Sequence, residues 1–130
     1  HDALPISDTI EIYVHVVQNG DESMTETDIM NQIRMDVSAA GNLIFRANVG
    51  KVRMKDGRWF DTGLPKGFPD LFGVDASGYI FFIEVKAPSG RIRDEQKRFL
   101  DAMTARGIRA GVAHNSTEAL EIVRGERHGY

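Results

Sequence analysis

Residues 70–86 constrain the fold of this chain more than any other segment. Two short runs that favour β-strands, 70–74 and 79–86, flank the sequence Asp75-Ala76-Ser77-Gly78, which is typical of a tight turn. The second run is apolar until it reaches Glu84 and Lys86 at its end. The pattern predicts an antiparallel hairpin whose second strand is buried and ends in charged side chains.

Segments on both sides of this hairpin show the spacing of helices and further strands. The predicted elements are helices at 26–40 and 93–106, a short last helix capped by Asn115 or Ser116, and strands at 43–48 and 109–114. Residues 49–61 form either a hairpin or an extended loop. Residues 63–69 are too rich in Gly and Pro for regular structure and are expected to form a loop.

A chain of 130 residues that is 42% hydrophobic is long enough for one core and too short for two. We expect one domain over residues 24–124 and a C-terminal tail over 125–130. Residues 1–23 are expected to be non-native or flexible, because the first six residues resemble a translated sequencing adapter and Met24 directly precedes a capping-box-like sequence. The alternative is a genuine strand, since apolar and polar residues alternate over 10–16.

Several classes of protein are excluded by what the sequence lacks. No apolar run approaches the roughly 18–20 residues that cross a bilayer, and the start does not resemble a secretory leader. The chain contains no Cys, so it has no disulfides, thiolate zinc sites or Cys nucleophiles. We therefore expect a soluble intracellular protein without membrane contact, in which oxygen or His would hold any metal.

The charge is distributed unevenly along the chain. The net charge is −3, yet residues 1–33 hold seven of the 19 acidic residues and none of the 16 basic ones. Residues 34–130 therefore contain more basic than acidic residues. Such a body can bind a polyanion, although a solvated surface of mixed charge gives the same counts.

The hairpin brings charged residues together at one end. Reflection through the turn places Asp70 opposite Ile83 or Glu84, and directly opposed residues have Cβ atoms about 4.5–5.5 Å apart. Glu84 and Lys86 share one face because strand side chains alternate. Two adjacent carboxylates repel each other, and a bound cation would relieve this repulsion. Oxygen ligands suit Mg²⁺ or Mn²⁺. The cluster predicts metal-dependent hydrolysis of a phosphate ester, whereas an exposed cross-strand ion pair is the structural alternative.

Three sequence motifs in this region resemble the PD-(D/E)XK nuclease superfamily. They are Gly67-Phe68-Pro69-Asp70, Glu84-Val85-Lys86, and Gln96 on the following helix. More narrowly, residues 24–123 resemble VRR-NUC domains, particularly the compact stand-alone forms of phages and prophages. The resemblance implies an α/β restriction-endonuclease-like core, a mixed β-sheet flanked by helices in the order α-β-β-β-α-β, with a short C-terminal helix.

The resemblance also implies roles for individual residues in a DNA endonuclease. Asp70, Glu84 and the backbone carbonyl of Val85 would bind Mg²⁺ or Mn²⁺, Lys86 would serve catalysis, and Glu26 would complete the site, with no organic cofactor. Helical spacing independently places Glu26 on the buried face, although an acid in a first turn is also favoured by the helix dipole. Gln96 is either a polar orienting residue or an exposed helix residue.

Polar and basic residues near these motifs are candidate DNA contacts. They are Arg46, Asn48, Lys51, Arg53, Lys55, Arg58, Arg91 and Arg93. Their alternative role is a solvated loop surface. Trp59 could stack on an unpaired base or cover the core, and we expect it to cover the core.

The small size of the chain and its resemblance to stand-alone nucleases also suggest partners and alternative functions. A small nuclease gains surface by forming a homodimer, and the stand-alone relatives suggest branched DNA such as a four-way (Holliday) junction, in the cytoplasm of a bacterial or phage-infected cell. One rival is a DNA-binding module with the same fold and no catalysis. Another is a hydrolase of small phosphate esters or nucleotides.

Overall fold

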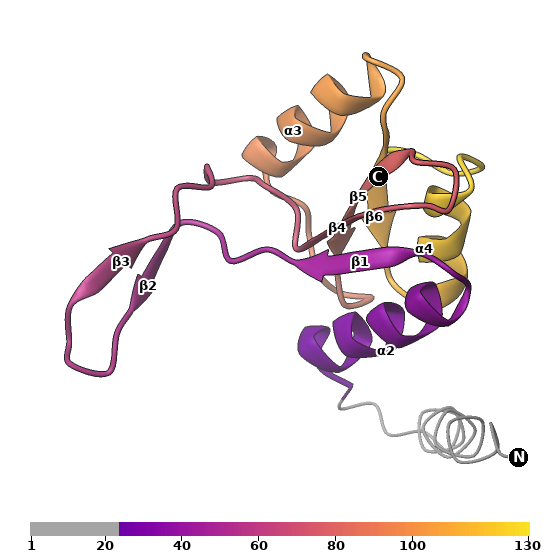
Figure 1. Ribbon diagram of the computed structural model, residues 1–130. Coiled ribbons are helices and arrows are strands. Elements are labelled where there is room, and N and C mark those ends of the chain that lie inside the picture. The colour runs from indigo at the N-terminus through magenta and orange to yellow at the C-terminus, as the bar shows by residue number, and fades with distance from the viewer. Residues whose placement is uncertain (1–23) are drawn as a thin grey trace, which may run out of the picture.

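A four-stranded mixed sheet forms the centre of the computed structural model, which describes residues 24–130 (Figure 1). Its strands are β1 (Leu43–Arg46), β4 (Leu71–Val74), β5 (Ile80–Val85) and β6 (Arg109–Ala113), in the order β1-β4-β5-β6. The pairs β1–β4 and β4–β5 are antiparallel, and β6 runs parallel to β5.

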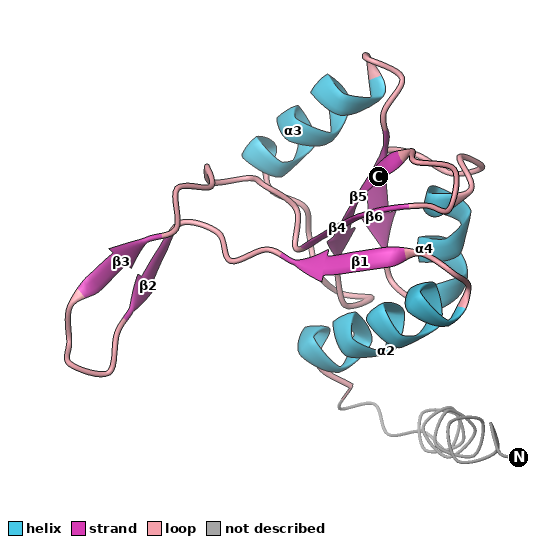
Figure 2. Ribbon diagram, viewed as in Figure 1, coloured by secondary structure: helices cyan, strands magenta, loops and turns pink. Residues whose placement is uncertain are grey.

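Helices cover both faces of this sheet (Figure 2). The helices α2 (Glu26–Ala39) and α4 (Ser116–Val123) pack on one face, and α3 (Asp94–Thr104) packs on the other. Side chains of β5 alternate between the two layers, with Phe81 in the first and Phe82 in the second. The predicted α/β architecture with a mixed sheet flanked by helices is confirmed.

The start of α2 follows from its first residues. The Thr25 hydroxyl accepts a hydrogen bond from the Asp28 amide at 3.1 Å, and the Asp28 carboxylate accepts one from the Thr25 amide at 2.9 Å. This capping box satisfies two amides that the first turn leaves without helical partners. One turn further on, Ile29 and Ile33 begin the buried stripe that holds the helix on the sheet.

The predicted hairpin at residues 70–86 is confirmed as β4 and β5. Leu71 pairs with Ile83, and the turn is closed by the Asp75 side chain, which accepts hydrogen bonds from the Ser77 and Tyr79 amides. All residues of β5 after Ile80 are buried. The strand β5 is therefore buried on both faces, and the charged residues of the candidate site lie at its end.

A second, two-stranded sheet stands apart from the first. It consists of β2 (Lys51–Arg53) and β3 (Trp59–Asp61), so residues 49–61 form a hairpin, one of the two predicted alternatives. The hairpin extends away from the main sheet (Figure 1). Trp59 is 61% exposed on it, so the expectation that Trp59 covers the core was wrong.

The two ends of the described chain are the remaining features. Residues 1–23, including the alternating segment 10–16, lie outside the described residues. Residues 125–130, expected as a tail, run beside β6, where the Gly129 amide donates to the Ala110 carbonyl and the Val112 amide donates to the Gly129 carbonyl. None of the helices within residues 24–130 is long and apolar enough to cross a membrane.

Candidate active site

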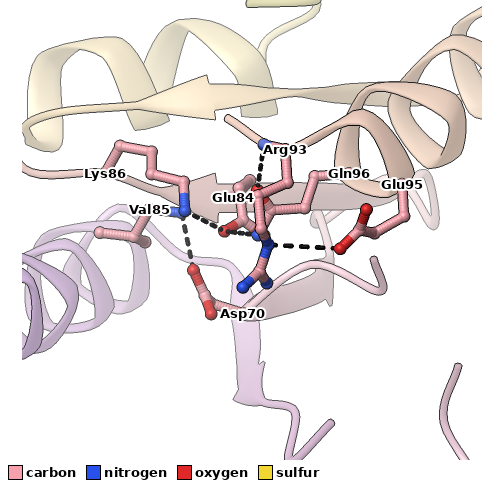
Figure 3. Close-up of polar contacts among 7 residues, drawn as sticks. All are labelled: Asp70, Glu84, Val85, Lys86, Arg93, Glu95 and Gln96. Atoms are coloured by element: carbon pink, nitrogen blue, oxygen red, sulfur yellow. Dashed lines mark hydrogen bonds and ion pairs between the residues drawn. The ribbon is translucent and has the colours of Figure 1, made fainter. Parts of the chain in front are cut away.

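Three strand ends meet at one end of the main sheet. β1 ends at Arg46, β4 begins at Leu71, and β5 ends at Val85, so the neighbouring residues Asp70 and Glu84 come side by side in the continued register. Glu84 lies on the α3 face of the sheet, together with Phe82 two residues earlier. This end of the sheet holds the cluster shown in Figure 3.

The loop before β4 fixes Asp70. Phe68 is held among aromatic rings, with centroids 5.1 Å from Phe99 and 5.8 Å from Phe82. The Asp70 Oδ2 atom accepts a hydrogen bond from the Val85 amide at 2.9 Å, and the Asp70 carbonyl accepts one from the Ala47 amide at 2.8 Å. Asp70 is therefore tied to β5 through its side chain and to the end of β1 through its backbone.

Gly67 allows this loop to touch α3. Its φ is +97°, and a Cβ at this position would lie 2.6 Å from the backbone oxygen of Glu95. We expect Gly67→Ala to destabilise the protein by about 2–5 kcal/mol, because left-handed backbone costs about 1–2 kcal/mol and overpacking about 1–3 kcal/mol. Gly63→Ala is the matched control, since Gly63 has a φ of +84° in the same loop and no atom within 4 Å of the added Cβ.

Urea unfolding of the two variants separates the steric cost of the added Cβ from the cost of left-handed backbone in the free energy of unfolding. Gly63→Ala should lose only about 1–2 kcal/mol. Equal losses in the two variants would contradict the close approach of Gly67 to α3.

Glu84 is an acid buried among polar neighbours. Its side chain is 2% exposed; its Oε2 atom accepts a hydrogen bond from Gln96 Nε2 at 2.9 Å and lies 3.5 Å from Lys86 Nζ. Burial raises the pKa of Glu84 to about 8, and the adjacent Asp70 carboxyl adds to this increase, while Lys86 opposes it. Without a further positive charge, the fold therefore favours the protonated acid at neutral pH.

The second oxygen of this carboxylate is unsatisfied. Glu84 Oε1 is buried and has no hydrogen-bond partner within the described part of the chain. The nearby Asp70 carboxylate accepts hydrogen bonds when ionised and so cannot donate one. A proton or a cation shared by Asp70 and Glu84 would satisfy both groups, so these residues fit a divalent metal ion.

The backbone of Val85 offers a further oxygen. Its amide points to Asp70, and the amide and carbonyl of one strand residue point to the same side. The Val85 carbonyl is therefore directed to the same side as Asp70. Within residues 24–130, no cluster of three or more His, Cys, Asp or Glu side chains is placed to hold a metal. Mg²⁺ commonly keeps several waters, so two carboxylates and a carbonyl suit it.

Glu26 does not join this cluster. It lies in the first turn of α2 and is exposed, so the prediction that it lies on the buried face was wrong. Within residues 24–130 no three acidic or His side chains are grouped to hold a metal, so Glu26 is not grouped with Asp70 and Glu84, and its role in completing the site stays a prediction. The helix-dipole alternative describes its position.

Gln96 connects α3 to the acid. It is 5% exposed, its Nε2 group donates to Glu84, and its Oε1 atom accepts a hydrogen bond from the Arg93 amide at 2.8 Å (Figure 3). The alternative of an exposed helix residue was wrong. One side chain thus caps the helix and orients the carboxylate.

Sequence reasoning missed Glu95, which connects the loop before β4 to the start of α3. Its carboxylate lies 3.7 Å from Lys66 Nζ and 3.4 Å from Arg93 Nε, and its backbone carbonyl lies next to Gly67. The signal available in the sequence was an acid in the first turn of α3, one residue before Gln96.

The predicted DNA contacts all lie on the surface. The exposed side chains are Arg46, Asn48, Lys51, Arg53, Lys55, Arg58, Arg91 and Arg93. Arg58 pairs with Asp56 at 2.7 Å and Arg93 with Glu95. Arg46 and Asn48 lie at the site end of β1 or just beyond it, and four of the others lie on the β2–β3 hairpin. The β2–β3 hairpin follows the end of β1, which lies at the same end of the main sheet as the end of β5 (Figure 1).

Comparisons with known proteins agree with this fold. The VRR-NUC domain family matches residues 14–117 of the chain. A solved structure described as a VRR_NUC domain superposes with a TM-score of 0.57 and 20% sequence identity, covering 78% of this chain and 97% of that chain. Comparison with curated proteins gave no significant match.

Proposed function

Because this chain belongs to the VRR-NUC domain family, a family of nuclease-type domains, we propose that it is a Mg²⁺- or Mn²⁺-dependent endonuclease that hydrolyses phosphodiester bonds in DNA. One observation carries the proposal. The buried Glu84 carboxylate has an oxygen without a donor in the described structure, beside Asp70 and with Lys86 at 3.5 Å. A proton or a cation would satisfy this site, and the ammonium group beside it suits a phosphate substrate, which favours a metal ion.

Asp70, Glu84 and the Val85 carbonyl would hold the metal ion. When bound, it would polarise a phosphoryl oxygen and lower the pKa of a water molecule. Asp70 and Glu84 are held before substrate arrives, Asp70 by the Val85 amide and Glu84 by Gln96. Fixed ligands avoid a reorganisation cost during the reaction.

Lys86 is the proposed catalytic cation. Its side chain is only 12% exposed, and its Nζ atom lies 3.5 Å from Glu84 Oε2. The ammonium is therefore held beside the carboxylates and does not point into solvent. From this position it would orient the attacking water and offset negative charge that develops on the scissile phosphate. Gln96 is a positioning residue that acts through Glu84.

The finer features of the activity belong to the same proposal. The motif around Asp70, Glu84 and Lys86 supports membership of the PD-(D/E)XK nuclease superfamily, and its resemblance to stand-alone relatives supports a form of the phage type. We propose a homodimer that cuts branched DNA such as a four-way junction in the cytoplasm, since two sites would act on two strands. Sedimentation of the free protein and the cleavage pattern of a labelled junction test these features.

The function is tested by comparing substrates under three metal conditions. Supercoiled plasmid, a labelled four-way junction, a nucleotide and bis(p-nitrophenyl) phosphate are incubated with Mg²⁺, Mn²⁺ or EDTA. We expect cleavage of DNA with either metal, much slower hydrolysis of the small diester, and no reaction with EDTA. DNA binding without cleavage under every condition would support the non-catalytic module instead. Faster turnover of the nucleotide than of DNA would support the small-substrate hydrolase.

A further inference from the structure

The β2–β3 hairpin presents two different faces to solvent. Strand pairing places Arg53 opposite Trp59, and the Arg53 guanidinium lies over the Trp59 ring at 5.5 Å from its centroid. Val52 and Phe60 point to the other face. Trp59 keeps 61% of its side-chain surface exposed with Arg53 against it, so the ring has area for a second stacking partner.

The charge of the hairpin is opposite to that of the whole chain. Residues 51–61 contain four basic and two acidic residues, whereas the chain has a net charge of −3. One of the acids, Asp56, is paired with Arg58 at the tip. Of the remaining basic residues, Arg53 lies over the Trp59 ring, and Lys51 and Lys55 lie on the same hairpin. Basic residues beside an exposed aromatic ring are typical of surfaces that bind a nucleic-acid backbone and stack its bases.

The hairpin is anchored directly beside the carboxylates. At its base the Thr62 amide donates to the Gly50 carbonyl at 2.9 Å, and the Gly50 amide donates to the Leu64 carbonyl at 3.3 Å. Three residues before Gly50, the Ala47 amide binds the carbonyl of Asp70. The base of the hairpin therefore lies at the end of the main sheet that holds Asp70, and its tip lies further from the carboxylates.

We propose that the β2–β3 hairpin is a DNA-holding arm in which Trp59 stacks on an unpaired base of the bound strand, several nucleotides away from the scissile phosphate. This inference rests on the proposed nuclease function and names a substrate feature that strengthens binding next to the site. Stacking requires a base with an open face, which single-stranded or gapped DNA offers and continuous duplex does not. Arg53 and Lys51 bind the neighbouring phosphates in this arrangement.

The binding test uses Trp59 as its own reporter, because it is the only Trp in the chain. In EDTA, which prevents metal-dependent cleavage, a single-stranded oligonucleotide and a gapped duplex should quench its emission, and a continuous duplex should not. Trp59→Ala should weaken binding of the gapped duplex by about tenfold with little change for the continuous duplex, and Trp59→Phe should retain most of the affinity.

Tyr79→Ala is the matched control. Tyr79 is 60% exposed and has Arg109 over its ring at 4.8 Å, but it lies at the opposite end of the main sheet. We expect this variant to bind both DNAs as the wild type does. The Tm of each variant verifies that it is folded.

Two results would overturn the inference. One is unchanged Trp59 emission at saturating gapped DNA, with wild-type affinity in Trp59→Ala. The other is an emission change that depends on protein concentration without DNA, which would make the hairpin an interface between two copies. Hydrolysis of bis(p-nitrophenyl) phosphate with Mn²⁺ is measured in parallel, so that loss of the arm and failure of the nuclease proposal are distinguished: Trp59→Ala should keep that activity.

Discussion

Asp70→Asn is expected to lower the rate of DNA cleavage by about 10²–10³-fold, the usual result of losing one fixed electrostatic contact in an active site. Asn keeps an oxygen that can accept the hydrogen bond of the Val85 amide, so the loop before β4 should stay in place. It removes the negative charge that, with Glu84, would hold the metal ion. The variant therefore tests the effect of the negative charge of Asp70 without changing the position of the loop.

The measurement is single-turnover cleavage of a labelled DNA at several Mn²⁺ concentrations. Glu121→Gln is the control, because it removes the same charge from α4 on the opposite layer. We expect Glu121→Gln to cut at the wild-type rate and Asp70→Asn to stay slow even at high Mn²⁺. Wild-type cleavage by a folded Asp70→Asn protein would contradict the assignment of Asp70 as a metal ligand.

Glu84→Gln is expected to stabilise the metal-free protein while abolishing cleavage. Burial and Asp70 raise the pKa of Glu84 from 4.5 to about 8, so ionising this acid is unfavourable in the folded protein. The stability linked to its protonation is complete below about pH 4.5 and is lost as the pH rises to about 8. A neutral amide avoids that loss, although it also gives up the contact with Lys86.

Thermal unfolding in EDTA and in Mn²⁺ checks this prediction. At pH 8 in EDTA we expect the Tm of Glu84→Gln to lie about 4 °C above that of the wild type, since 1 kcal/mol shifts the Tm by roughly 4–8 °C in smaller domains and roughly 2–4 °C in larger ones. Mn²⁺ should raise the Tm of the wild type and have little effect on the variant, because a ligand stabilises only the state that binds it. A variant that is less stable than the wild type at pH 8 and equally responsive to Mn²⁺ would refute this account of the buried acid.

The central hairpin could be predicted from the sequence because its signals are local. The turn sequence after Val74 and the apolar run before Glu84 determine the pairing within 17 residues, and Leu71 indeed pairs with Ile83. Alternation of strand side chains then places Glu84 and Lys86 on one face, which the ion pair between them reflects. The site residues that lie on this hairpin could therefore be proposed without a structure.

Residues outside the hairpin were harder to place because tertiary packing decides their environment. Glu26 lies one turn before Ile29, the first buried residue of α2. Helical spacing predicted that Glu26 is buried too, but the first turn of the helix does not pack against the sheet. Trp59 is apolar, and the sequence does not show that the β2–β3 hairpin extends away from the core. The contact of Gln96 with Glu84 depends on how α3 packs across the sheet, which spacing along the chain does not determine.

The most direct test of the catalytic site compares the wild type with Lys86→Met in single-turnover cleavage of supercoiled plasmid, with Mg²⁺, Mn²⁺ or EDTA. Arg124→Met, which removes a positive charge at the end of α4, is the control. We expect the wild type and the control to cut with either metal and not with EDTA, and Lys86→Met to be at least about 10²-fold slower while it stays folded and binds DNA. Metal-dependent cleavage by Lys86→Met at the wild-type rate would contradict the assignment of the active site to Asp70, Glu84 and Lys86.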